Sequence, residues 1–515
     1  MASARPSPRA LIIGIDGGDF AAVDPLVERG LLPNIAGLLR RSASADTRCT
    51  WPAHTAPGWS TFVSASNPGG HGIYQFFDTQ DRNYGATTTT ADRLGRSSVW
   101  DWLAAQGYTL GLVNIPMSHP PADLPGYQVS WPLEHTTRYC RPRTLLAELA
   151  RNNAHFQTDL ATMFSGDLAY FDQAQANLAA RARSMSYLMR THPTDVAMVV
   201  FTEVDRVGHH YWHYFAQDHP RHVTPPKDSG WDEALRHTYQ AVDAAVGELL
   251  SLVDEDTTVV LVSDHGLGMG RHALSVHRLL EEAGLLHALP HNETAATASW
   301  FSGAGRTVDF TRTRVYQPVP GSYGLNLNLW GRQRDGIVAD GERERLSREV
   351  ADLLLAVELP GGGKVVRDVL PRELAYPGPH TESAPDLLVI PADESVLLVG
   401  DLDADVWKPS WQTGLHRHAG LWAQASPRTR PGRLATPVDL TAAIPTLLAD
   451  LGARWPASVH GTPVTAALDS EVDIKDPDPS LDGGAAWLPV RSVDSSGTST
   501  EDEYTSDRLR EMGYI

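Results

Sequence analysis

The sequence predicts an α/β fold in which a mostly parallel central sheet is flanked by helices. Short aliphatic and β-branched runs recur along the chain, and five of them are "ALIIGIDGGD", "TLGLVNIPMS", "DVAMVVFTEVD", "TTVVLVSDHG" and "DLLVIP". Continuous apolar runs of this kind are typical of strands that are buried on both faces, as in parallel sheets. Helical patterns lie between the runs, and this alternation is typical of layered α/β proteins.

The clearest helical pattern covers residues 231–253. Its apolar residues Leu235, Tyr239, Val242, Val246 and Leu249 share one face. Less regular stretches predict insertions at about residues 120–190 and 287–380, which we expect to form a cap or pocket wall. We expect one main domain over residues 8–470. Residues 471–515 are predicted to form an acidic tail that ends in a docking helix.

The composition of the chain argues against several classes of protein. The chain has 515 residues, 42% of them hydrophobic, and a formal net charge of −19. Such an acidic chain is a poor binder of nucleic acid polymers, whose phosphates are held by Lys and Arg. The two cysteines, Cys49 and Cys140, form no disulfide framework. The apolar run at residues 11–15 is too short for a signal peptide or a membrane span. We therefore expect a cytoplasmic protein without a membrane partner, and the sequence does not indicate its oligomeric state.

Three of the predicted strands end in acidic residues. Asp16 follows the first run, Asp205 follows "VVFTEV" and Asp264 follows "VVLVS", and two histidines stand close by, at His209 and His265. Ligands collect at the carboxyl ends of strands in such sheets. Zinc accepts carboxylate oxygen and imidazole nitrogen, and manganese accepts the same ligands. The pattern predicts a site for two divalent metal ions, Zn or Mn, of the kind that promotes phosphoryl transfer.

A stretch rich in hydroxyl groups, residues 49–76, contains the candidate nucleophiles Thr55, Ser60, Thr61 and Ser64. A threonine hydroxyl needs a base or a metal ion beside it to react at neutral pH. Within the stretch only His54 and another histidine, in "GGHGI", could act as the base. Direct coordination to a metal ion is the alternative. A structural role is also open for Thr55, because threonine often caps a helix.

Several motifs in this chain resemble those of the alkaline phosphatase superfamily. They are "IGIDGGD", "TAPGWSTFVSASNPGGHGI", "DRVGHH", "SDHG" and "GLHRHAG", in the family's order over residues 13–420. The resemblance is greatest to its type I phosphodiesterase and nucleotide pyrophosphatase branch, which includes predicted phosphohydrolases and phosphomutases. It implies an alkaline-phosphatase-like catalytic domain with inserted cap segments.

The resemblance also implies roles for individual residues. Asp16, Asp264 and His265 would hold one metal ion, and Asp205 and His209 would hold the other with a late histidine. Of the two late candidates, His416 fits the family spacing G-x-H-R-x-x-G, and His418 would lie outside the ligand set. Thr55 would contact the first metal ion and become transiently phosphorylated. The implied ligands are Asp16, Thr55, Asp205, His209, Asp264, His265 and His416.

The chain departs from the family pattern at one point. Nucleotide pyrophosphatases carry an Asn shortly after "HGI", where this chain has Phe76. Gln75 or Asn114, with the backbone N–H of Ala56, could stabilise the phosphoryl oxygens instead. The segment "TAPGW" lacks the Cys or Ser and the Arg of a sulfatase motif. No Arg stands near Thr55 in the sequence, which favours a diester or pyrophosphate over a phosphomonoester.

These observations predict a binuclear metal-dependent hydrolase that cleaves a phosphodiester or phosphoanhydride in a small molecule through a phosphothreonine intermediate. Two alternatives remain open. One is a phosphomutase or phosphomonoesterase of the same superfamily, and the other is a noncatalytic protein that binds phosphate or metal ions.

Overall fold

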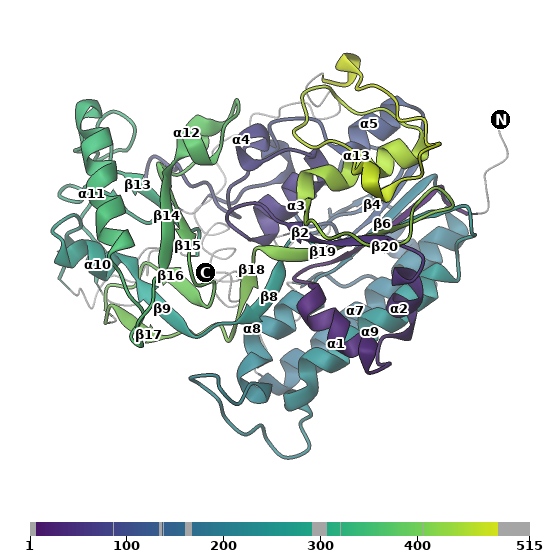
Figure 1. The fold of residues 1–515 in the computed structure, drawn as a ribbon, viewed down its shortest axis with the longest axis horizontal. Coiled ribbons are helices and arrows are strands. Elements are labelled where there is room, and N and C mark those ends of the chain that lie inside the picture. The colour runs from purple at the N-terminus through teal and green to yellow at the C-terminus, as the bar shows by residue number, and fades with distance from the viewer. Residues whose placement is uncertain are drawn as a thin grey trace.

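The computed structural model describes residues 7–85, 87–132, 136, 138–159, 167–290, 306–319, 321–403 and 405–482. A ten-stranded sheet forms its centre (Figure 1). In spatial order its strands are β20 (Gly432–Arg433), β2 (Ala43–Arg48), β19 (Ala419–Ala425), β7 (Thr258–Val262), β1 (Ala10–Ile15), β6 (Val196–Phe201), β3 (Leu110–Val113), β4 (Gly126–Val129) and β5 (Cys140–Arg141), with β21 (Val438–Asp439) paired to β2. The strands from β7 to β4 run parallel, whereas β19 and β5 run antiparallel to their neighbours. The prediction of a mostly parallel sheet is therefore confirmed.

Helices cover both faces of the central sheet, which explains why its strands are apolar throughout. In β1, Leu11, Ile13 and Ile15 point to one face, and Ala10 and Ile12 point to the other. The first face is packed by α1 (Phe20–Glu28), α2 (Pro33–Leu39), α6 (Leu145–Arg151), α7 (Asp167–Thr191) and α9 (Ala234–Leu250). The second face is packed by α3 (Thr55–Ser64), α5 (Val99–Ala105) and α13 (Leu440–Leu451).

The predicted amphipathic helix at residues 231–253 is present as a short 3-10 turn followed by α9. Tyr239, Val242, Val246 and Leu249 are buried in the core, and Leu235 is partly buried against it. The turn before α9 is η3 (Trp231–Glu233), and the described residues also form η1 (Ala91–Arg93), η4 (Asp340–Glu342), η5 (Thr381–Ser383), η6 (Thr465–Ala467) and η7 (Pro479–Asp482).

A second lobe, to the left of the central sheet in Figure 1, has its own apolar core. It contains an antiparallel sheet of β12 (Val315–Tyr316), β13 (Gly324–Leu327), β15 (Leu387–Pro391) and β14 (Val366–Pro371). It also contains β9 (His272–Ser275), β16 (Val396–Val399), β17 (Trp407–Pro409), the pair β10 (Ala288–Leu289) and β11 (Thr307–Val308), and helices α10 (Val276–Glu282), α11 (Arg343–Leu355) and α12 (Arg372–Ala375).

The run "DLLVIP" forms β15 and so belongs to this second sheet, which corrects its predicted place in the parallel sheet. The physical reason is that β15 is also buried on both faces. Leu387 and Val389 pack into the core of the second lobe, and Leu388 and Ile390 pack into a separate cluster with Tyr74 and Tyr376. Burial on both faces gives the same apolar run in either kind of sheet.

The regions expected to be insertions contribute to different parts of the fold. Residues 120–190 supply β4 and β5 to the edge of the central sheet and α7 to one of its helical layers. Residues 287–380 supply β12, β13 and β14 to the second lobe. The docking helix expected near the C-terminus lies outside the described residues, and the domain boundaries stay a prediction. None of the described helices combines the length and apolarity needed to cross a bilayer.

Candidate active site

The candidate site begins at the ends of three neighbouring strands. β1 lies between β6 and β7, and all three run parallel in register, so their carboxyl ends meet at one edge of the sheet. Asp16 directly follows β1, and Asp264 and His265 follow β7. Asp205 lies in the first turn of α8 (Glu203–Phe215), just after β6. The topology therefore brings the three strand-end carboxylates together, and all three are fully buried.

Two further histidines join this edge from other elements. His209 lies one helical turn after Asp205 on α8, and i, i+4 spacing places both on one face. His416 lies on β18 (Gly414–Arg417), which pairs antiparallel with β8 (Gly266–Met269), the strand that starts after His265 (Figure 1). His418 instead stacks on Trp51, with ring centroids 4.3 Å apart. The structure thus brings His416 to the site and not His418.

One group of ligand atoms surrounds the Nε2 atom of His265. This atom lies 3.3 Å from Asp264 Oδ2, 3.5 Å from Asp16 Oδ1 and 3.3 Å from Thr55 Oγ1. The Thr55 hydroxyl is also 3.3 Å from Asp16 Oδ1, to which it donates. Asp16, Asp264 and His265 are close enough together to hold one metal ion, with the threonine oxygen beside it.

A second group lies next to the first. His416 Nε2 is 3.1 Å from Asp205 Oδ1, and His209 Nε2 is 3.2 Å from the same oxygen. The Nε2 atoms of His209 and His416 are 3.0 Å apart. The rings of His265 and His416 have their centroids 3.9 Å apart, so the two groups adjoin, and His265 also lies within ligand distance of Asp205 and His416.

Backbone carbonyls orient all three imidazoles in the same way. The Nδ1 atom lies 2.8 Å from Gly414 O in His209, 3.0 Å from Gly266 O in His265 and 2.9 Å from Ala53 O in His416. A carbonyl oxygen only accepts hydrogen bonds, so each Nδ1 carries the proton and donates it. In the neutral ring the lone pair is then on Nε2, which faces the site. Hydrogen bonds of this kind orient histidines that bind metal ions.

The nucleophile candidate is the first residue of α3. The cap of this helix is His54, whose Nδ1 accepts the Ala56 N–H at 3.2 Å, so Thr55 is not needed as a cap. Gly58 allows α3 to approach β7 closely, because a Cβ there would lie 2.9 Å from the Cβ of Asp264. The fully buried Thr55 hydroxyl is therefore held at the edge of the sheet where the carboxylates meet.

The other hydroxyls of the stretch point elsewhere. Thr61 Oγ1 lies 3.0 Å from the Nε2 of His71, whose Nδ1 accepts the Ile73 N–H. Ser64 donates to the backbone carbonyl of Ser60 at 2.6 Å. Both ring nitrogens of His71 thus form hydrogen bonds within this segment. Of the four candidate hydroxyls, only that of Thr55 contacts the acidic cluster, by which we mean the carboxylates of Asp16, Asp205 and Asp264.

Sequence reasoning missed Trp59, which supports the site directly. Its indole Nε1–H donates to Asp16 Oδ2 at 3.0 Å, while Thr55 holds the other oxygen of that carboxylate. Trp59 and Thr55 are four residues apart on α3 and therefore share a face. That spacing is the signal that could have identified it, although a buried tryptophan more often packs in a core.

The site opens into a cleft of about 490 Å³. His54, His209 and His416 line it on the side of the acidic cluster, and Trp51, Tyr323, Glu394 and Gln412 are among its other walls. Burial raises the pKa of Glu394, whose Oε1 accepts the His418 N–H at 2.7 Å. Among the described residues that line this cleft there is no Lys or Arg.

Comparison with known proteins identifies the family of this chain. The model of the type I phosphodiesterase / nucleotide pyrophosphatase family matches residues 10–418. The chain belongs to this family. Membership identifies it as a phosphohydrolase of the alkaline phosphatase superfamily. No curated protein matches the chain.

Solved structures of other proteins share this fold. Phosphonoacetate hydrolase from Sinorhizobium meliloti 1021, in complex with phosphonoacetate, has a TM-score of 0.51 and 14% identity, over 85% of this chain and 94% of that chain. An inactive variant of murine ectonucleotide pyrophosphatase / phosphodiesterase 5, in complex with AMP, has a TM-score of 0.50 and 12% identity, over 87% and 95%. The alkaline-phosphatase-like fold predicted from the sequence is thereby confirmed.

The donor set of this phosphodiesterase family member fits divalent cations. Neither buried carboxylate oxygen of Asp264 accepts a hydrogen bond of good geometry from a described residue. The lone pairs of His209 and His416 face each other at 3.0 Å, an arrangement that is repulsive unless a cation or a proton lies between them. Carboxylate oxygens and neutral imidazole nitrogens are the ligands that Zn and Mn accept.

The electrostatics of the cluster lead to the same conclusion. Burial, together with the charge of Asp205, raises the pKa of Asp16 well above its ordinary value. Burial and the charges of Asp16 and Asp205 raise the pKa of Asp264 in the same way. Burial also lowers the pKa of His265 well below its usual range. Protons alone would therefore leave these groups largely neutral, whereas divalent cations would return both carboxyls to the ionised form.

The two residues expected to stabilise the phosphoryl group in place of the family Asn are both buried. Gln75 Oε1 accepts the Phe76 N–H at 2.7 Å, and its Nε2 has no described partner. Asn114, at the end of β3, donates from Nδ2 to Val200 O at 2.9 Å and has a left-handed φ of 59°. The Ala56 N–H is engaged by His54. The role of these groups stays a prediction.

Proposed function

We propose that this protein hydrolyses small phosphodiesters, with Thr55 as the nucleophile and two divalent metal ions at the edge of the central sheet. The observation that carries the proposal is the position of Thr55 Oγ1, which lies 3.3 Å from both Asp16 Oδ1 and His265 Nε2. Only a hydroxyl beside a base or a metal ion is an effective nucleophile at neutral pH.

The residues that would hold the metal ions form the two groups described above. Asp16, Asp264 and His265 would hold the ion nearer Thr55, and Asp205, His209 and His416 would hold the other. Bound there, two divalent ions would lower the pKa of a coordinated hydroxyl and would stabilise negative charge on the reacting oxygens. Zn is the first choice for this mixed carboxylate and imidazole set, and Mn is the second.

The chain's own groups account for the two chemical steps. Thr55 Oγ1–H points at Asp16 Oδ1, which can accept its proton. The Thr55 oxygen then forms a bond to phosphorus as the bond to the leaving alcohol breaks, and the leaving oxygen takes a proton from water. In the second step a water molecule attacks phosphorus and loses a proton to solvent, while the threonine oxygen leaves and takes its proton back from Asp16, which releases a phosphate monoester. Trp59 keeps Asp16 oriented throughout by donating to its other oxygen.

The lining of the cleft supports a diester over the alternatives. A monoester brings a doubly charged phosphate, and a phosphoanhydride brings a second phosphate beyond the one attacked. The described residues of the cleft include no Lys or Arg that could neutralise this additional negative charge, and Glu394 adds a carboxyl group there. Among the fold relatives, one was solved with AMP and another with phosphonoacetate, which supports a small substrate that carries a phosphorus oxyanion.

A comparison of three substrates tests the proposal. With added Zn or Mn, kcat/KM is expected to be at least about tenfold higher for bis-p-nitrophenyl phosphate than for p-nitrophenyl phosphate or for the anhydride bonds of ATP. A preference for the monoester or for ATP would overturn the diester assignment. Transfer of the phosphoryl group back to the product, without release to water, would indicate a phosphomutase. Inertness towards all three substrates in the presence of either metal would contradict hydrolysis.

A further inference from the structure

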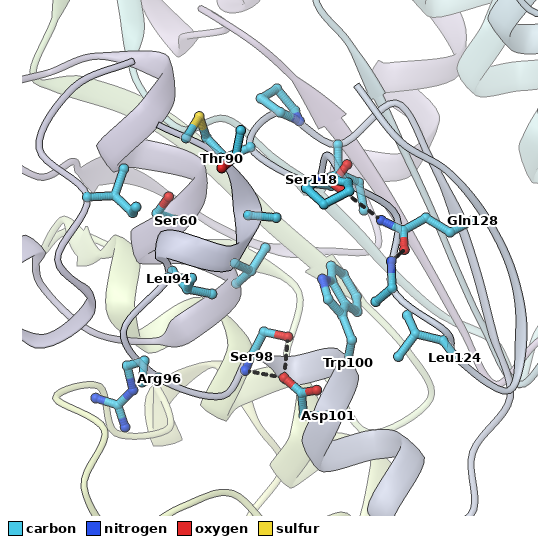
Figure 2. Close-up of a pocket in the computed structure, with 18 residues that line it drawn as sticks. Ser60, Thr90, Leu94, Arg96, Ser98, Trp100, Asp101, Ser118, Leu124 and Gln128 are labelled. Atoms are coloured by element: carbon cyan, nitrogen blue, oxygen red, sulfur yellow. Dashed lines mark hydrogen bonds between the residues drawn. The ribbon is translucent and has the colours of Figure 1, made fainter. Parts of the chain in front are cut away.

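A second cavity lies behind α3, on the face of the central sheet that α3 and α5 cover. Its volume is about 740 Å³ when the space that opens to solvent is included. Its wall is largely apolar and includes Val63, Ile73, Leu94, Ile115 and Leu124. It shares no lining residue with the active-site cleft. Figure 2 shows Ser60 and Leu94 on one side of it and Trp100 and Leu124 on the other.

Most polar groups in this wall are already paired with other parts of the protein. The Asp101 carboxylate accepts both the backbone N–H and the hydroxyl of Ser98, as Figure 2 shows. The Gln128 amide accepts the Ala122 N–H and donates to the backbone carbonyl of Ser118. Arg96 directs its terminal nitrogens to Ser66 and Ser458. The Asp101 carboxylate and the Gln128 amide are therefore satisfied within the protein, whereas the Nε–H of Arg96 has no described partner.

Ser60 also has a polar group without a partner, and it is the only such hydroxyl among the described residues of the wall. Its side chain is 2% exposed, and its hydroxyl has no hydrogen-bond partner in the described structure. A serine in a helix commonly donates to the carbonyl four residues earlier, as Ser64 does to Ser60 on the same helix. Ser60 makes no such bond and faces the cavity (Figure 2). A buried hydroxyl without a partner is costly, so this position favours a ligand that supplies one.

The cavity lies on a different side of α3 from the candidate active site. Ser60 lies five residues after Thr55, about 140° around the helix, so the two hydroxyls point to different sides of α3. A molecule in the cavity would contact the back of the helix that carries the candidate nucleophile without reaching Thr55.

We propose that this cavity is a second binding site, for a small uncharged molecule that is largely apolar and carries one hydrogen-bonding group. The apolar body would pack against Leu94, Trp100 and Leu124, and the polar group would pair with Ser60 Oγ. The wall is largely apolar and the Asp101 carboxylate is already paired with Ser98, which favours an uncharged ligand.

A fluorescent probe of this class tests the site in the full-length protein. N-phenyl-1-naphthylamine is uncharged, has two aromatic groups and carries one N–H, which can donate to Ser60 Oγ. Titration is expected to give saturable fluorescence enhancement at one site per chain. Ser60→Ala should raise the Kd about fivefold, because one hydrogen bond is lost. Ser64→Ala is the matched control on the same helix, and its Kd should equal that of the wild type.

Two cavity-filling variants complete the test. Ala122→Trp and Ala91→Trp each place a large side chain in the cavity and should abolish binding, and the second serves if the first does not fold, as judged by circular dichroism. Excess inorganic phosphate should leave probe binding unchanged. The proposal is overturned if the probe does not bind, if a folded filling variant binds it as the wild type does, if Ser60→Ala leaves the Kd unchanged, or if phosphate displaces the probe.

Discussion

The Nε2 atoms of His209 and His416 lie 3.0 Å apart, although each imidazole donates its Nδ1–H to a backbone carbonyl. In neutral rings this arrangement points two lone pairs at each other, and Asp205 Oδ1 lies within 3.2 Å of both nitrogens. Three electron-pair donors converge on one small region. We infer that the fold is shaped to be completed by a cation at this point.

Replacing the candidate nucleophile Thr55 should abolish hydrolysis without abolishing metal binding. Thr55→Ala should lower kcat for bis-p-nitrophenyl phosphate by more than about 10³-fold, because no other described hydroxyl contacts the acidic cluster. Bound metal should remain, since the carboxylates and imidazoles are unchanged. Thr61→Ala, on the same helix, is the control and should retain activity. Substantial turnover by Thr55→Ala would show that another group is the nucleophile.

Replacing His416 and replacing His418 should have different effects on metal content and activity. His416→Ala removes a proposed ligand whose Nε2 lies 3.1 Å from Asp205 Oδ1, and it should reduce both metal content and kcat. His418→Ala removes a ring that stacks on Trp51 and should leave the metal content unchanged. Elemental analysis together with steady-state kinetics on both variants checks this. Equal losses in the two variants would contradict the choice of His416.

Trp59 is expected to act as a positioning residue. Trp59→Phe keeps most of the buried ring but removes the donor to Asp16 Oδ2, so metal affinity should fall about tenfold. Trp102→Phe is a matched control, because Trp102 is equally buried and donates its indole N–H to Ser97, which is not part of the metal cluster. Metal affinity measured by competition with a chelating dye distinguishes the two. If the Trp59→Phe variant binds metal as tightly as the Trp102→Phe variant, the role of Trp59 is limited to packing in the core and the positioning role is contradicted.

A buried charge cluster stabilises the start of α8. Arg181, which is fully buried, pairs with Asp159 and Glu203, and Glu203 is two residues before Asp205, a proposed metal ligand. Arg181→Met would leave two buried carboxylates without this cation and should lower the free energy of unfolding by about 3–5 kcal/mol. Urea denaturation measures the change. A loss below about 1 kcal/mol, within the range of a surface pair, would contradict this role for the cluster.

The sequence was sufficient to predict the parallel core and the residues of the cluster. The apolar runs before Asp16, Asp205 and Asp264 are long enough to indicate strands, and adjacent parallel strands necessarily bring their ends together. His416 was predicted by the spacing of a family motif and not by physical reasoning, because β18 reaches the site through its pairing with β8. No local pattern reports a pairing between segments so far apart.

Other features depend on tertiary contacts that a sequence does not encode locally. The run that forms β15 has the same apolar character as β1 but lies in an antiparallel sheet, since burial on both faces does not report strand direction. The contact of Trp59 with Asp16 and the carbonyls that orient the three histidines required the assembled structure. The free hydroxyl of Ser60 could likewise be recognised only once the cavity beside it was known.

Metal content is the most direct test of the central claim that two adjoining groups of carboxylates and imidazoles hold two divalent ions beside Thr55. Protein purified with Zn or Mn and analysed by inductively coupled plasma mass spectrometry is expected to contain about two ions per chain, and His209→Ala about one. Chelation should abolish hydrolysis, and re-addition should restore it. Protein that contains less than one ion per chain and hydrolyses bis-p-nitrophenyl phosphate at full rate in excess chelator would contradict the account.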